Sequence, residues 1–268
     1  MRRLSGLFLV VLASMLAMAQ RRDCATMMQQ ALDLTGVNQD IDAMAQMVVS
    51  DDYLREITAS KDDGSDFAAI FKPVMRKNFD GPSLKKELLH RVVARCQPER
   101  MEQALQELQS PFVAHMLELE TSRYTPERQE KIKQYMRIIE IAPPPDSQLS
   151  AAEAFDEKVG ESEFTVEYLF AIYRGILTGA GAPPDVIKQL QEHRKQMKAR
   201  IEGLVQASIL ITYTGVSKAD LAKYGQERSS GSLKWYYDTV RQSFLEMLEL
   251  RARAIGQDVR TATVAQTN

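Results

Sequence analysis

The fold of this chain is predicted best from residues 214–244, whose sequence is TGVSKADLAKYGQERSSGSLKWYYDTVRQSF. This stretch holds the only tryptophan, Trp235, and three of the nine tyrosines. Residues that favour helix lie on both sides of a Ser-Ser-Gly sequence, and glycine is common where a helix ends and the chain turns. The stretch therefore predicts two helices joined by a tight corner, the second longer than the first.

The composition of the whole chain extends this prediction. Its 268 residues are 44% apolar and 26% charged, with 13 glycines and 10 prolines. Ala, Leu, Glu, Gln, Lys, Arg and Met are abundant, whereas the Val-Ile-Thr alternation typical of strands is nearly absent. We therefore expect an all-α protein, a helical bundle long enough to bury a sizeable core. The net charge of −2 gives no basic field that would indicate nucleic acid as a partner.

The N-terminus has the features of a secretory signal peptide, residues 1–19. Two arginines at positions 2 and 3 precede a short apolar run and the cleavage-site pattern Ala17-Met18-Ala19. Cleavage after Ala19 would give a mature chain that begins at Gln20 and is exported to the periplasm or secreted. The apolar run is short for a bilayer span, and an uncleaved anchor is the alternative. We expect no transmembrane anchor after cleavage.

Export changes the interpretation of the two cysteines, Cys24 and Cys96. In an oxidising compartment an even pair most often forms a disulfide, which here would close a loop of about 70 residues. A catalytic thiol is the alternative, but the chain has no Cys-x-x-Cys sequence and no activating groups close to Cys24. The sequence therefore predicts a Cys24–Cys96 disulfide.

Three consecutive prolines mark the clearest boundary in the mature chain, since they stop helices and favour an extended spacer. They predict an N-terminal helical half, a proline-rich linker, a C-terminal helical half and a flexible tail, at residues 20–141, 142–149, 150–258 and 259–268. An internal repeat is also predicted, because Leu-Thr-Gly ends a helix in each half, at residues 34–36 and 177–179. Whether the halves are independent domains or share one core is left open by the sequence.

Two short segments carry a family resemblance. Residues 107–113, ELQSPFV, and residues 228–235, RSSGSLKW, each combine serine with proline or glycine ahead of an apolar or aromatic helix. This layout resembles a bacterial family of exported helical domains of unknown function, whose motif is Phe-Tyr-x-Ser-Pro-x-Gly. The Phe-Tyr pair is missing from the first segment and the proline from the second. The resemblance implies a helical fold and export, and it implies no activity.

Motifs for catalysis, metals and cofactors are missing from the sequence. The three histidines, His90, His115 and His193, are far apart and form neither an H-E-x-x-H sequence nor a zinc-type cluster with cysteine. Acidic pairs such as Asp62-Asp63 lack the spacing of a calcium loop. No nucleotide-binding glycine loop and no G-x-S-x-G sequence is present. We therefore predict no catalytic residues, no metal site and no cofactor.

Aromatic side chains gather in residues 214–244. Because tyrosine and tryptophan are apolar with one polar end, they suit a binding groove as well as a core boundary. One face of the second helix is expected to fill the core, and the other is a candidate groove for a partner. The candidate binding residues are Tyr224, Trp235, Tyr236, Tyr237 and Phe244.

Two classes of function remain open. The first is an exported interaction or binding protein of the bacterial envelope, whose partner is a protein segment or an apolar ligand. The second is a hydrolase whose histidine and glutamate residues meet only in the folded protein. The missing motifs favour the first class. A His115 or His193 side chain within hydrogen-bond reach of a carboxylate in a cleft would favour the second.

Overall fold

The computed structural model describes residues 24–50, 64–122 and 144–267, together with isolated positions between 123 and 143. Every regular element in these residues is a helix, which confirms the predicted all-α fold. The predicted signal peptide, residues 1–19, lies outside the described residues. None of the described helices combines the length and the apolar character that crossing a membrane requires.

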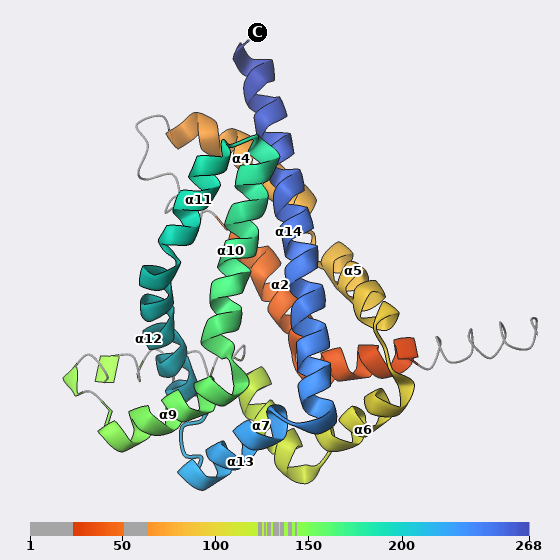
Figure 1. Cartoon of the computed structure of the whole chain (residues 1–268), viewed down its shortest axis with the longest axis vertical. Helices are drawn as coiled ribbons and strands as arrows, with labels where there is room; N and C mark the ends of the chain where they lie inside the picture. The colour runs from red at the N-terminus through yellow and green to blue at the C-terminus, as the bar shows by residue number, and fades with distance from the viewer. Residues whose placement is uncertain are drawn as a thin grey trace, which may run out of the picture.

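The helices follow one another through short turns (Figure 1). An unlabelled first helix covers residues 24–34. The labelled helices are α2 (Val37–Val48), α4 (Gly64–Asn78), α5 (Gly81–Ala94), α6 (Pro98–Leu108), α7 (Pro111–Thr121), α9 (Asp146–Val159), α10 (Glu161–Ala180), α11 (Pro184–Glu192), α12 (Arg194–Thr212), α13 (Lys218–Arg228) and α14 (Gly231–Thr267).

The corner predicted from the Ser-Ser-Gly sequence separates α13 from α14. Gly231 has a φ of 57°, in the left-handed region that favours glycine. Ser217 begins α13 and its side chain accepts a hydrogen bond from the backbone amide of Asp220, as an N-cap does. The Ser110-Pro111 corner likewise separates α6 from α7, with Pro111 in the first turn of α7. Both motif segments therefore join two helices in the structure.

The long helix α14 and the helix α10 form the most extensive helix pair, and they run side by side in the same direction (Figure 1). Small residues allow this close approach. A Cβ atom added at Gly179 would lie 2.0 Å from the backbone oxygen of Arg253, and one added at Gly256 would lie 2.1 Å from that of Ile176. Gly256 lies inside α14, which continues to Thr267.

One hydrophobic core joins the two predicted halves. Its buried residues come from both sides of the prolines, so the halves share one core across the described residues. The largest fully buried side chains in it include Met28, Leu32, Leu84, Met101 and Met116 before the prolines, and Phe155, Tyr224, Leu233 and Tyr236 after them. A much smaller cluster, Val166, Phe170 and Ile201, lies between α10 and α12.

The predicted disulfide is present. Cys24 and Cys96 are bonded, with their Cα atoms 6.1 Å apart and a sequence separation of 72. The bond ties the start of the first helix to the chain just after α5. In Figure 1 the first helix is the red helix beside α6. The covalent link therefore holds the first helix against the N-terminal part of the core, where Met28 and Leu32 are fully buried.

The structure differs from the sequence prediction at the linker and at the tail. Of the predicted linker, residues 146–149 belong to α9, which begins directly after Pro145 and has Asp146 in its first turn, where a negative charge is favourable. The predicted tail, residues 259–267, continues α14 as helix. The predicted internal repeat stays a prediction.

Candidate functional site

A pocket of about 440 Å³ lies among helices that are far apart in sequence: α2, α7, α9, α10, α12, α13 and α14. Small-molecule sites typically have volumes of about 300–1,000 Å³, so this pocket is large enough for a ligand. Its described lining divides into an aromatic and aliphatic wall and a charged end.

The wall consists mainly of aromatic rings. Tyr168 and Phe244 are stacked, with ring centroids 6.2 Å apart, and Phe164 lies 6.3 Å from Phe244. Aliphatic side chains of α2, α12 and α14 complete the wall. The wall residues include Met44, Phe155, Phe164, Tyr168, Val205, Ile209, Val240 and Phe244. Such a surface is suited to the apolar part of a ligand.

At the charged end, Glu120 of α7 accepts hydrogen bonds from three side chains. The hydroxyl of Tyr213 and that of Tyr224 both donate to its Oε1 atom, the latter over 3.0 Å. Nη1 of Arg228 donates to the same oxygen over 3.2 Å. Three donors compensate for the water that this partly buried carboxylate has lost.

Arg228 links this carboxylate to a second one. Its Nη2 donates to Oε1 of Glu161 over 2.7 Å, and Nη2 of Arg241 lies 2.9 Å from the same oxygen. Arg228 lies in the last turn of α13 and Glu161 in the first turn of α10, so each charge is favoured by the dipole of its own helix. The result is a network of two carboxylates and two guanidinium groups.

Burial and charge act against each other at Arg228. Its side chain is 7% exposed. Burial alone lowers the pKa of the guanidinium, but Tyr237, Glu120 and Glu161 outweigh this and raise the pKa well above its usual value. The guanidinium is therefore charged, and it lies over the Tyr237 ring with its central carbon 4.2 Å from the ring centroid.

The tyrosine hydroxyls at this end stay protonated. Burial raises the pKa of Tyr213 and Tyr224 well above the usual value, and the charge of Glu120 raises both further. Burial also raises the pKa of Tyr237, to about 12. At neutral pH all three hydroxyls can therefore donate hydrogen bonds.

Two buried polar atoms at the charged end have no hydrogen-bond partner within the described part of the chain: Nε of Arg228 and the hydroxyl oxygen of Tyr237. A buried polar group without a partner costs about 1–3 kcal/mol, so such atoms are rare in folded proteins. Both can donate to an oxygen atom. Neither atom exposes surface to the open space of the pocket, so both belong to the packed network behind its lining.

The structure distributes the five candidate aromatic residues over three places. Tyr224 and Tyr236 are fully buried in the core. Tyr237 and Phe244 line the pocket. Trp235 is half-buried on another face of α14, where the Arg100 guanidinium lies 5.5 Å from its ring centroid. The five side chains thus do not form one groove.

Tyr236 illustrates why a core aromatic cannot be told from a pocket aromatic by spacing. Its hydroxyl lies 2.9 Å from Oγ1 of Thr35, which itself donates to the carbonyl oxygen of Ala31. Tyr236 therefore donates to Thr35 and connects α14 to the end of the first helix. The adjacent Tyr237 points to the pocket, since neighbouring residues on a helix are about 100° apart around its axis.

Sequence reasoning missed the four charged residues of the site. Glu120, Glu161 and Arg241 were not singled out, and Arg228 was noted only as part of the corner sequence. The ion pairs of Arg228 span 108 residues to Glu120 and 67 residues to Glu161. No local pattern reports a contact over such separations.

The three histidines lie away from the pocket. His90, His115 and His193 are all exposed, and none of them is among the described lining residues. Nδ1 of His115 is 3.9 Å from a carboxylate oxygen of Glu118, and both side chains are largely in solvent. The hydrolase alternative therefore gains no support from them. Within the described ranges no group of three or more His, Cys, Asp or Glu side chains could hold a metal ion.

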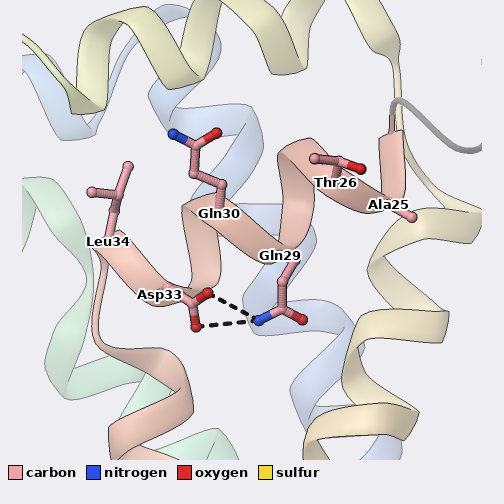
Figure 2. A pocket seen from close by; sticks show the side chains of 6 residues that line it. All are labelled: Ala25, Thr26, Gln29, Gln30, Asp33 and Leu34. Carbon is pink, nitrogen blue, oxygen red and sulfur yellow. Dashed lines mark hydrogen bonds between the residues drawn. The ribbon is translucent and has the colours of Figure 1, made fainter.

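A second hollow lies along the first helix. Figure 2 shows its six lining side chains, all from residues 25–34, and Gln29 donates to both carboxylate oxygens of Asp33 over 3.1 and 3.2 Å. The hydrogen bonds drawn there join Gln29 and Asp33, one turn apart on the same helix. We assign no function to this surface.

Comparison of the chain with protein families, with curated proteins and with solved structures finds no match. The resemblance to the family of exported helical domains therefore stays a prediction. The function must be argued from the pocket.

Proposed function

We propose that this protein is an exported binding protein of the bacterial envelope and that the pocket between α10, α12 and α14 holds an apolar ligand. The observation that carries the proposal is the pocket itself: about 440 Å³ of space beside an aromatic wall. Apolar side chains left beside open space lose the contacts that a packed core would give them. A bound apolar molecule would restore these contacts.

Several features support a binding role without chemistry. Tyr213, Tyr224 and Tyr237 are held as protonated donors, and Arg228 is held as a charged group. None of these groups is poised to exchange a proton near neutral pH, as a general acid or base would be. The network is instead suited to fixing the helices that surround the pocket.

A neutral dye tests the proposal. N-phenyl-1-naphthylamine fluoresces strongly in apolar surroundings, and we expect it to bind the purified protein with its disulfide intact. Ser208 is exposed and lines the pocket, so it lies at the pocket mouth. The substitution Ser208→Trp should therefore obstruct entry and weaken dye binding by about tenfold.

Leu204→Trp is the matched control. Leu204 lies one turn earlier on α12, is 63% exposed and is not among the lining residues. The substitution Leu204→Trp adds the same side chain to the same helix at a position outside the pocket lining. Dye binding by this variant should therefore equal that of the wild type. The proposal is wrong if the wild type does not bind the dye, or if the two variants bind it equally well.

Export is the second part of the proposal. The disulfide fits an oxidising compartment. Intact-mass measurement on protein recovered from the envelope should give the mass of a chain that begins at Gln20 and carries no free thiol. A retained Met1, or two thiols that react with a labelling reagent, would contradict export.

A further inference from the structure

The charges around the pocket restrict which apolar ligand can enter it. The described lining includes three carboxylates and two guanidinium groups, a net charge of −1, from Asp40, Glu120, Glu161, Arg228 and Arg241. A ligand with a charged head would lose the hydration of that charge on entering the pocket. An ion pair could offset this desolvation cost only if an opposite charge in the lining were free to pair with the ligand.

No guanidinium in the lining is free for an anion. Arg228 donates to both Glu120 and Glu161, and Arg241 is paired with Glu161. An anionic head would have to displace a carboxylate that the fold already holds in place, and it would meet a lining that is net negative.

The carboxylates are equally occupied. Glu120 accepts three side-chain hydrogen bonds, Glu161 is bound by two arginines, and Asp40 also has an interaction partner. A cationic head would therefore find no carboxylate that is waiting for a counter-charge. Both signs of charge are excluded for the same reason, because the network is already paired.

An uncharged molecule does not need a counter-charge in the lining. The rings of Phe164, Tyr168 and Phe244 are suited to cover its apolar chain.

We infer that the ligand is an uncharged molecule with an apolar chain that lies along the Phe164, Tyr168 and Phe244 wall. This inference rests on the proposed function, because it specifies the ligand of the same pocket. It predicts that the pocket accepts an acyl ester and rejects the fatty acid anion of the same chain length.

Three probes with the same ten-carbon chain test the inference by displacing N-phenyl-1-naphthylamine: methyl decanoate, decanoate and decyltrimethylammonium. Methyl decanoate should displace the dye at a concentration about tenfold lower than either ion. If decanoate or decyltrimethylammonium displaces the dye as readily as the ester, the inference is overturned while the proposed function stands. If the dye does not bind at all, it is the proposed function that fails.

A pair of variants on α10 tests the charge argument directly. Glu161→Gln removes one carboxylate from the network and leaves the arginines less fully paired, so decanoate should bind about fivefold more tightly than to the wild type. Glu163→Gln is the matched control, since Glu163 pairs with Arg194 and Lys198 and is not among the lining residues. Decanoate binding that is unchanged in Glu161→Gln would contradict the charge argument.

Thermal melts of every variant establish that it is folded. If a variant does not fold, the comparison of the three probes on the wild type still decides the inference.

Discussion

The close contact between α10 and α14 gives the sharpest test of the fold. A Cβ atom at Gly179 would lie 2.0 Å from the backbone oxygen of Arg253, 2.9 Å from its carbonyl carbon and 3.0 Å from the backbone nitrogen of Gln257. These are backbone atoms of α14, so no side-chain rotation can relieve the clash. The substitution Gly179→Ala must therefore push the two helices apart.

The size of the effect follows from two opposing terms. Alanine favours helix over glycine by about 1 kcal/mol, and overpacking a core typically costs about 1–3 kcal/mol and sometimes more. Because the contact involves two helix backbones, we expect the upper part of this range and a net loss of about 2 kcal/mol. At about 2–4 °C per kcal/mol for a chain of this size, the melting temperature should fall by about 4–8 °C.

Gly203→Ala is the control for this prediction. Gly203 lies in α12, and a Cβ atom added there meets nothing within 4 Å. Only the helix propensity changes, so stability should rise by about 1 kcal/mol. Both variants are compared with the wild type by circular dichroism melts. If Gly179→Ala melts at or above the wild-type temperature, the close approach of α10 and α14 is refuted.

Three further predictions concern other parts of the molecule. Cys96→Ser, which opens the 72-residue disulfide loop, should lower the free energy of unfolding by about 4 kcal/mol, measured by urea denaturation. A loss within the error of that measurement would contradict the stabilising role of the disulfide. Burial alone would raise the pKa of Glu87, but Arg91 and Arg251 hold this pKa below its ordinary value of 4.5. The Glu87 carboxylate therefore stabilises the fold above pH 4.5, and this stabilisation is lost as the pH falls through the folded-state pKa. The difference in melting temperature between wild type and Glu87→Gln should accordingly shrink on acidification from pH 7, and a constant difference would count against the ion pairs. Trp235→Ala should lower the free energy of unfolding by about 2 kcal/mol, less than truncation of a fully buried tryptophan would. Dye binding should stay unchanged, because Trp235 lies outside the pocket. Weakened dye binding in the folded variant would place Trp235 at the site.

Several features of the fold follow from local sequence. The Ser-Ser-Gly corner separates two helices because glycine adopts positive φ at little cost, and Gly231 does so. The Ser-Pro corner separates two more, since proline suits the first turn of a helix. The disulfide could be predicted because only two cysteines are present and the N-terminus indicates export. In each case a few neighbouring residues, or a count, contain the physical cause.

Glycine shows where local reasoning fails. Gly181 ends α10 in the left-handed conformation, as a glycine near a helix end is expected to do. Gly256 lies inside α14 instead, and the backbone of α10 occupies the space where its side chain would lie. This close packing is a property of the tertiary structure.

The sequence alone determined the helical class, the corners and the cysteine pair, since these depend on backbone preference and on covalent chemistry. Only the tertiary structure decided the site. Tyr236 and Tyr237 are adjacent, yet one fills the core and the other lines the pocket. Arg228 meets Glu120 and Glu161 across 108 and 67 residues of chain, because helix packing brings their helices together and buried charges require partners.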